Sequence, residues 1–207
     1  MRPLLIPPLV IALALGTAAS AAGLLPPPAS KRLKDQPRQI LLGPIYKERH
    51  SCSDHTAISW DLGDSLGTDC IVVSDYGHGF PKFYRTNGKS NEDWYGWHAE
   101  VLAPVDGRIV GTFINRVENT PGTFGKGQAS AIQILTSHNQ IVILVHITNI
   151  RVVRGELVKK GQVIAQVGNS GIADAPHTHV GAYDLKTDLP LQIRWNLMEQ
   201  AKISGEH

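Results

Sequence analysis

The sequence of 207 residues predicts a mainly β fold, a sandwich or barrel built from antiparallel strands. Short runs of β-branched and apolar residues follow one another at close spacing, and glycines separate them. No segment before Asn196 has the apolar periodicity of an amphipathic helix. Hydrophobic residues make up 42% of the chain and charged residues 18%, which is ordinary for a globular domain and too apolar for a disordered one.

The strand signals become dense from residue 100 onward. A first strand over 100–104 leads into the turn Val105-Asp106-Gly107, and the segment 119–128 is expected to be a loop because it is rich in glycine. Further strands are expected at 108–113, 131–135, 140–146, 152–153, 157–158, 163–167 and 177–184. The preceding segment, 52–96, is polar and rich in turn residues, and it predicts no clear element.

The N-terminal residues have the pattern of a secretory signal peptide, which we expect over residues 1–21. Arg2 supplies a positive charge, an apolar run follows over 4–15, and Ala19-Ser20-Ala21 has the small residues of a cleavage site. A membrane anchor is the alternative, but two prolines within the apolar run make a weak spanning helix. We therefore expect an exported protein, periplasmic or secreted. No cysteine stands directly after the cleavage site, which argues against a lipoprotein.

One domain is expected, because the chain has an ordinary single-domain length. Residues 22–44 are linker-like, with three consecutive prolines and a basic cluster; the folded domain is expected over 45–197, and 198–207 as a C-terminal tail. The formal net charge of +2 is too small to predict a nucleic-acid partner, although it is compatible with an anionic wall polymer.

Cys52 and Cys70 are the only cysteines of the chain. In an exported protein an even pair is expected to form a disulfide, and two reduced thiols are the alternative. Closing a loop of this size would stabilise the fold by roughly 3 kcal/mol.

The sharpest cluster of chemistry-bearing residues is Pro176-His177-Thr178-His179. Residues i and i+2 of a strand point to the same face about 7 Å apart, so one histidine can bind a metal while the other faces a substrate held there. His146 ends the apolar run 141–145, where a satisfied core histidine is the alternative interpretation.

Farther upstream, His55 and Asp61 offer an imidazole and a carboxylate. A catalytic zinc needs three protein ligands of this kind and one open position, and His55, Asp61 and His179 would make such a set. Each donor atom must lie about 2 Å from the ion, whereas a straight strand would separate positions 55 and 61 by about 20 Å. The segment between them must therefore bend, and a Cys52–Cys70 bridge could help to hold the bend. The alternative is that Asp61 caps a turn.

From about His55 to Asp184 the chain resembles the LytM/lysostaphin-type zinc endopeptidases. Five pieces carry the resemblance in the family's order: HTAISWD at 55–61, VLAPVDGRIV at 101–110, LVH at 144–146, VVRGELVKKGQVIAQVGNSG at 152–171 and PHTH at 176–179. Each piece alone is a weak signal, and all of them in order are a strong one.

The resemblance implies a barrel-sandwich arrangement of antiparallel sheets, with long loops around a metal cleft. It makes His55, Asp61 and His179 zinc ligands, and it makes His146 and His177 the catalytic pair beside the metal. The implied activity is that of a zinc metalloendopeptidase, which hydrolyses peptide cross-bridges of bacterial peptidoglycan. Zinc would polarise the scissile carbonyl, and either histidine of the pair would accept a proton or hydrogen-bond the oxyanion.

Three departures from the family pattern leave details open. Five residues separate His55 from Asp61 where the family usually has three, so His50 competes with His55 as the first ligand. A long segment after Asp61 is an insertion whose role the sequence does not reveal. The leucine of the family's PHLH motif is Thr178, and Gly181 stands where a glutamate often follows.

Two other classes fit parts of the same sequence. The segments APVDGRIV and GELVKKGQVIA also resemble the two halves of biotinyl or lipoyl carrier domains, but the hairpin-tip lysine that a carrier needs is missing between them. The nearer alternative is a catalytically inactive relative that binds cell-wall peptide or activates another wall hydrolase. Such relatives typically lose ligands, whereas every required residue type is present here, which favours activity.

Overall fold

The computed structural model describes residues 23–24, 36–56, 63–74 and 80–204. The expected signal peptide over 1–21 and the predicted ligand Asp61 lie outside these residues. The described chain is mainly β, as predicted, and its strands pair in antiparallel fashion except in one two-stranded sheet. Among the described residues, no helix is long and apolar enough to cross a membrane.

The described strands are short, as the close spacing of β-rich runs predicted. They are β1 (Gln39–Leu42), β2 (His50–Asp54), β3 (Thr68–Val72), β4 (Glu100–Leu102), β5 (Gly107–Phe113), β6 (Ala131–Leu135), β7 (Gln140–Val145), β8 (Ile147–Thr148), β9 (Leu157–Val158), β10 (Val163–Val167), β11 (Thr178–Asp184), β12 (Leu189–Pro190) and β13 (Gln192–Trp195). The helices within the described residues are the 3-10 helix η2 (Asn91–Asp93) and α1 (Leu197–Ser204). The predicted strand over 152–153 does not form; this segment leads into a tight turn in which Glu156 N–H donates to the Val153 carbonyl.

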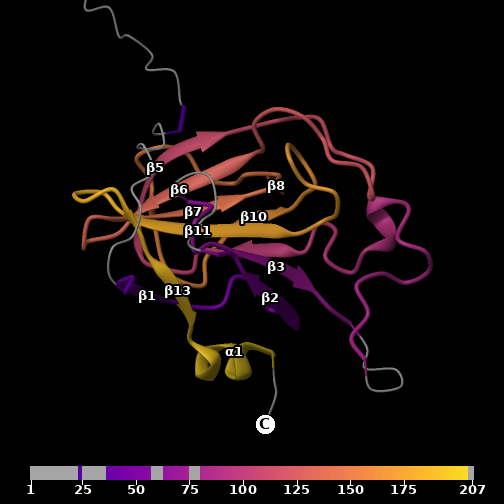
Figure 1. The fold of residues 1–207 in the computed structure, drawn as a ribbon, viewed down its shortest axis with the longest axis horizontal. Coiled ribbons are helices and arrows are strands. Elements are labelled where there is room, and N and C mark those ends of the chain that lie inside the picture. The colour runs from indigo at the N-terminus through magenta and orange to yellow at the C-terminus, as the bar shows by residue number, and fades with distance from the viewer. Residues whose placement is uncertain (1–22, 25–35, 57–62, 75–79, 205–207) are drawn as a thin grey trace, which may run out of the picture.

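The largest sheet has the strand order β2-β3-β11-β7-β6-β5-β9, and β12 pairs with β11 outside this path. A second antiparallel sheet contains β4, β10 and β8, and β1 pairs with β13 in parallel. In Figure 1, β11 crosses the middle of the molecule between β3 and β7, and α1 lies at the foot of the view below β13. The path of the largest sheet ends at β2 and at β9, so the described strands form open sheets and no closed barrel.

The core fixes the position of β11. All seven residues of β11 are buried, so both faces of this strand are covered. On the neighbouring β7, Val142 and Leu144 face the main core, whereas Ile141 faces the other side and packs with Tyr183 of β11. This division follows from the alternation of side chains across a strand. A strand held on both faces is a rigid base for the residues at its start, where the PHTH motif lies.

The segment 22–44, which we expected to be linker-like, contains β1. Ile40 and Leu42 are buried while the alternating residues are exposed, which is the burial pattern of a strand with one covered face. Leu42 also accepts a hydrogen bond from Asn196 N–H at 2.8 Å. The partner of β1 lies near the other end of the sequence, so the local composition gave no sign of this pairing.

The segment 52–96 also contains elements that its composition did not predict. β2 and β3 form an antiparallel pair in which Cys52 lies directly opposite Cys70. The two cysteines form the expected disulfide, with Cα atoms 4.1 Å apart. The bridge therefore joins β2 to β3 beside Asp69, and β3 in turn pairs with β11.

Candidate metal centre and catalytic cleft

Three neighbouring strands bring the histidines and a carboxylate together. In β11, His179 lies opposite Asp69 of β3 on one side and opposite Val145 of β7 on the other. Opposed residues on one face of an antiparallel pair have Cβ atoms about 5 Å apart, so Asp69 and His179 meet across the strands. His146 directly follows β7, between Val145 and the start of β8, with a φ of 61° in the left-handed region. His177 immediately precedes β11.

The described residues contain one group with metal-ligand spacing, formed by His55, Asp69 and His179. One ligand atom of each residue lies within 4.8 Å of the others. His55 Nε2 is 3.0 Å from Asp69 Oδ2, and His179 Nδ1 is 2.9 Å from Asp69 Oδ1. Tetrahedral zinc ligands at 2.0 Å are about 3.3 Å apart, so small adjustments would place these atoms around one ion.

The four predicted site histidines line one cleft: His55, His146, His177 and His179. Asp61 lies outside the described residues, so its role as a ligand stays a prediction. His50, the competing first ligand, lies elsewhere; its ring packs edge-on against Tyr46, and its Nδ1 is 3.0 Å from the Glu48 carbonyl. The structure therefore brings His55, and not His50, to the other histidines.

Asp69 was missed by the sequence reasoning. Its segment gave no strand signal, and the family-like motif directed attention to Asp61. The segment Thr68–Val72 has two polar residues followed by three apolar ones, so its sequence lacks the alternation that would have indicated a strand. In β3 the side chains of Thr68, Cys70 and Val72 are buried, whereas Asp69 is only partly buried and faces the cleft with His179.

Both ring nitrogens of His55 and both of His179 face oxygen acceptors. The second contacts are His55 Nδ1 to Asp64 Oδ1, at 3.0 Å, and His179 Nε2 to the Gly63 carbonyl, at 2.8 Å. A neutral imidazole has one N–H donor, so each ring leaves one of its two acceptor contacts without a proton. A cation between the two rings and Asp69 would take the place of the missing protons, so this donor set fits a metal ion.

The electrostatics of the group agree with that fit. Burial disfavours the protonated form of His55, but the carboxylates of Asp69 and Asp64 outweigh burial and raise the pKa of this imidazole. Burial would also raise the pKa of Asp69, but its contacts with His177 and His179 outweigh burial and hold that pKa far below its ordinary range. Asp69 is therefore ionised, as a metal-binding carboxylate must be.

His146 and His177 form a second pair in the cleft, with ring centroids 4.7 Å apart. Each ring donates its Nδ1–H to a backbone carbonyl, His146 to Ser170 and His177 to Ala175, both at 2.8 Å. In the neutral rings these bonds leave Nε2 as the unprotonated nitrogen. Burial, reinforced by the neighbouring His177, lowers the pKa of His146 to about 3, so this imidazole is neutral near pH 7.

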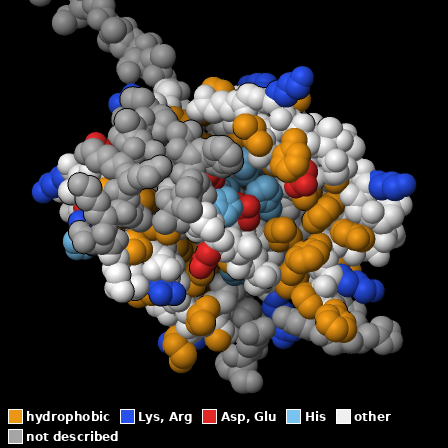
Figure 2. Space-filling view, viewed as in Figure 1, with side chains coloured by type: hydrophobic (Ala, Val, Ile, Leu, Met, Phe, Trp, Pro, Cys, Tyr) orange, Lys and Arg blue, Asp and Glu red, His pale blue; other side chains and the backbone are white. Residues whose placement is uncertain are grey.

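The cleft has room for a peptide. Its volume is about 770 Å³, and apolar side chains line it beside the histidines. Phe124 and Ile172 stand on its rim with 64% and 70% of their surfaces exposed, next to Asp174. Figure 2 shows histidine and acidic side chains at the floor of a hollow, with hydrophobic side chains gathered along one flank.

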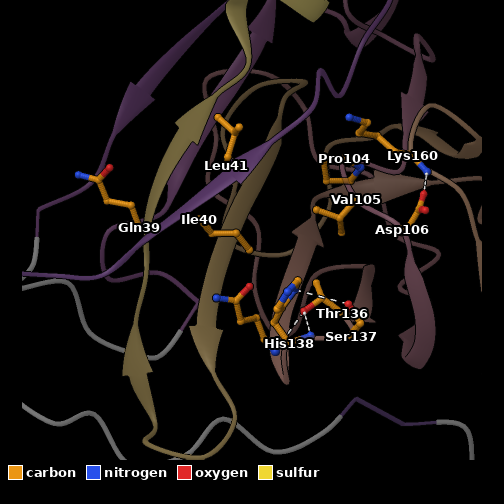
Figure 3. A pocket seen from close by; sticks show the side chains of 11 residues that line it. Gln39, Ile40, Leu41, Pro104, Val105, Asp106, Thr136, Ser137, His138 and Lys160 are labelled. Carbon is orange, nitrogen blue, oxygen red and sulfur yellow. Dashed lines mark hydrogen bonds between the residues drawn. The ribbon is translucent and has the colours of Figure 1, made fainter.

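A second cavity, of about 550 Å³, lies at the opposite end of β7 (Figure 3). Its lining runs from Ile40 and Leu41 of β1 to His138, and Gln140 at the start of β7 also borders it. Only one of its lining residues is a histidine, and the metal-ligand group described above lies at the other end of the strand. Within the part of the chain that the structure describes, the side chains suited to metal binding therefore gather in the histidine-lined cleft.

Residues 95–190 match the model of peptidase family M23. This match confirms the resemblance inferred from the sequence motifs and supports a peptidase role. It includes His146, His177 and His179, whereas His55 and Asp69 lie before it. No curated protein matches the sequence.

Solved structures similar to this chain share little sequence with it. One, from Pseudomonas aeruginosa and described as a candidate peptidase M23, has 17% identity and a TM-score of 0.44; the match covers 84% of this chain and 54% of that chain. The catalytic domain of lysostaphin from Staphylococcus simulans has 17% identity and a TM-score of 0.39, covering 65% and 79%. A zinc-containing peptidase from Vibrio cholerae has 19% identity and a TM-score of 0.35, covering 60% and 45%.

Proposed function

Since residues 95–190 match peptidase family M23, we propose that the chain is a zinc metalloendopeptidase that hydrolyses peptide cross-bridges of bacterial peptidoglycan. The observation that carries the proposal is the group His55, Asp69 and His179, whose donor atoms surround one point beside a second histidine pair. Three histidine and carboxylate ligands, with the fourth coordination position left open, are typical of catalytic rather than structural zinc.

Zinc would be held by His55 Nε2, an Asp69 carboxylate oxygen and His179 Nδ1, the atoms that face one another in the cleft. When bound there, zinc supplies Lewis acidity, which polarises a scissile carbonyl and promotes the ionisation of water. The protein's own contribution is to hold the three ligands in one orientation. Asp69 does so from a strand whose backbone is paired on both sides, by β2 and by β11.

His146 and His177 are the proposed acid–base pair. Because the Nδ1–H of His146 is held by the Ser170 carbonyl, its Nε2 carries the lone pair that would accept a proton from the attacking water. His177 lies between this ring and the metal ligands, with Nε2 3.6 Å from Asp69 Oδ1. With Nε2 protonated as well, its second N–H would be placed to donate a hydrogen bond to the oxygen on which negative charge develops.

The rest of the cleft supports a peptide substrate. Ligand sites are typically concave and mostly apolar, with a few fixed polar groups that set orientation. Here the exposed side chains of Phe124 and Ile172 border the histidines and offer apolar contact to a chain that crosses the site. A glycine bridge and a D-Ala–diaminopimelate bond are both candidate substrates.

Export to the periplasm or the medium is part of the same proposal. The Cys52–Cys70 disulfide supports it, because structural disulfides persist in oxidising compartments. The signal-peptide pattern over 1–21 supports it from the sequence.

The decisive experiment incubates the purified, zinc-loaded protein with defined cross-linked muropeptides of both bridge types and follows the products by mass spectrometry. We expect cleavage of a peptide bond in one bridge type, its loss with a chelator and its recovery when zinc is restored. Binding of muropeptide without cleavage by zinc-replete protein would instead favour the inactive relative.

A further inference from the structure

We propose that Asp64 is a positioning residue for the metal ligand His55, and that the turn 63–67 to which it belongs sets the orientation of both ligand histidines. The inference rests on the zinc site proposed above and goes beyond its ligands. It assigns a role to the beginning of the insertion, which the sequence left without one.

The geometry separates the two nitrogens of each ligand ring by role. His55 presents Nε2 to Asp69 and Nδ1 to Asp64, both at 3.0 Å. His179 presents Nδ1 to Asp69 at 2.9 Å and Nε2 to the Gly63 carbonyl at 2.8 Å. Residues 63 and 64 therefore hold the nitrogens that point away from Asp69.

Backbone hydrogen bonds close the turn 63–67 and tie it to His55. Gly67 N–H donates to the Asp64 carbonyl at 3.0 Å and so closes the turn. The Gly67 carbonyl accepts the backbone N–H of His55 at 2.7 Å, which ties the end of the turn to the ligand's own backbone. Asp64 therefore reaches the imidazole of His55 from a segment already bonded to that residue.

Glycines at three positions allow the turn to pack against β11. Gly63 has a φ of 102°, in the left-handed region that side chains rarely adopt. A Cβ on Gly67 would lie 2.7 Å from His179 Cε1, and a Cβ on Gly181 of β11 would collide with the Gly63 carbonyl. Gly181 stands where the related peptidases often have glutamate, so this chain has backbone contact in place of a side chain.

The consequence is a fixed tautomer for each ligand. An Nδ1–H of His55 donated to Asp64 leaves Nε2 free for the metal, and an Nε2–H of His179 donated to Gly63 leaves Nδ1 free. Carboxylate and carbonyl partners of this kind orient a ligand histidine and increase its basicity, and their loss typically weakens metal binding about 10–100-fold.

The alternative role for Asp64 is that of a direct ligand. Its Oδ1 is 3.9 Å from His179 Nε2, so it lies near both rings. That nitrogen, however, is closer to the Gly63 carbonyl, and Asp64 is outside the group whose ligand atoms surround one point. The structure thus favours Asp69 as the metal-binding carboxylate and Asp64 as the residue that orients His55.

The test measures zinc affinity of the disulfide-intact protein at pH 7 by competition with a chromogenic chelator. For Asp64→Ala we expect one zinc per chain at saturation, bound about 10–100-fold more weakly. Asp64→Asn keeps a hydrogen-bond acceptor, so it should lose less zinc affinity than Asp64→Ala. Asp64→Glu keeps a carboxylate and should bind zinc more tightly than Asp64→Ala. Thermal melting of the zinc-free variants identifies any that fail to fold.

Asp54→Asn is the matched control, since Asp54 is an exposed carboxylate next to His55 in the sequence and outside the metal-ligand group. It should bind zinc within about 2-fold of the wild type, a difference typical of an exposed charge. Gly181→Ala leaves Asp64 in the sequence but displaces the turn, and it should weaken zinc binding as Asp64→Ala does. Cobalt spectra report coordination directly, and Asp64→Ala should keep the wild-type band shape.

Several results would overturn the proposal. An Asp64→Ala protein that binds zinc as tightly as Asp54→Asn would show that Asp64 positions nothing, and complete loss of zinc from folded Asp64→Ala would make it a ligand. Failure of Asp64→Glu to recover any affinity would also contradict an acceptor role. If the wild type itself binds no zinc, the proposed function fails with it, and that result is distinguishable from the others.

Discussion

At the scale of single residues, the cleft divides its histidines into two kinds by their hydrogen bonds. His55 and His179 each face acceptors with both ring nitrogens, which suits metal ligands. His146 and His177 each give one nitrogen to a backbone carbonyl and keep the other for chemistry. The two kinds should therefore respond differently to substitution.

Removing a ligand should abolish zinc binding, whereas removing one of the other histidines should not. We expect His179→Ala and Asp69→Ala to lose both zinc and hydrolysis, because each deletes one of three protein ligands. His146→Ala and His177→Ala should keep zinc and lose turnover about 10²–10⁴-fold, the usual effect of removing a positioned acid–base group. Elemental analysis and muropeptide hydrolysis of the same preparations provide the measurements.

The same assay decides between the two candidate carboxylates. If Asp69 is the ligand, the Asp61→Ala protein should still bind zinc. If Asp61 is the ligand instead, the Asp69→Ala protein should still bind zinc. His50→Ala serves as a control on the first histidine, because its ring lies against Tyr46 and away from the cleft. Loss of zinc from His146→Ala with retention in His179→Ala would contradict the assignment.

At the scale of elements, β3 connects the disulfide to the candidate metal site. Cys70 and Asp69 are consecutive in this strand, so the bridge to Cys52 holds the segment that also carries the carboxylate. The disulfide and the ligands are therefore parts of one local structure.

Replacing both Cys52 and Cys70 by alanine should lower the free energy of unfolding by roughly 3 kcal/mol, because the unfolded chain gains the freedom of an open loop. Urea unfolding of the zinc-free proteins measures this change. Reduction of the wild type should give a similar loss, and Cys52→Ala/Cys70→Ala should then be insensitive to reductant. An unchanged midpoint in the double variant would contradict a stabilising bridge.

The C-terminal end of β11 depends on an ionised Asp184. Burial raises the pKa of this carboxyl, but hydrogen bonds from the Thr187 and Lys186 amides and from Arg38 outweigh burial, so its folded-state pKa lies below the ordinary value. A carboxyl with a lowered folded-state pKa contributes stability above its unfolded pKa of about 4, and this stability is lost as pH falls through the folded value.

Asp184→Asn should therefore be less stable than the wild type at pH 7, by about 1.5–3 kcal/mol, the usual value of hydrogen bonds to a charged group. The difference should shrink as the pH falls below about 4. Urea unfolding of the zinc-free proteins between pH 7 and pH 3 tests this. A difference that stays constant over this range would show that ionised Asp184 does not stabilise the fold.

At the scale of the whole molecule, the proposed zinc ligands come from segments far apart in the sequence. His55 follows β2, Asp69 lies in β3 and His179 lies in β11, so the three meet only in the folded chain. The complete site therefore exists only in the native state. An ion that binds the native state and not the unfolded chain stabilises the fold by mass action.

Zinc should accordingly raise the thermal midpoint of the wild type. At free zinc about 1,000 times the dissociation constant, the expected stabilisation is about 4 kcal/mol. Calorimetry of metal-free protein with and without added zinc measures it, and His179→Ala should show little shift. Equal midpoints for the wild type with and without zinc would argue against a native metal site.

The sequence by itself predicted the mainly β class, most strands after residue 100, the disulfide and the four histidines of the cleft. These features depend on local information: the two-residue alternation of strands, glycines at turns, an even cysteine pair and an ordered set of motifs. Side-chain direction within a strand is likewise local, and it placed His177 and His179 on the same side of the chain.

Only the tertiary structure decided that Asp69 joins His55 and His179, that β1 pairs with β13, and that Gly181 accommodates the turn 63–67. Each of these contacts joins segments distant in sequence, and each depends on strand register. Because a shift of one residue turns every side chain to the other face, register is fixed by the packing of the whole core. The position of Asp69 opposite His179 is a result of that packing, which the local pattern around either residue does not contain.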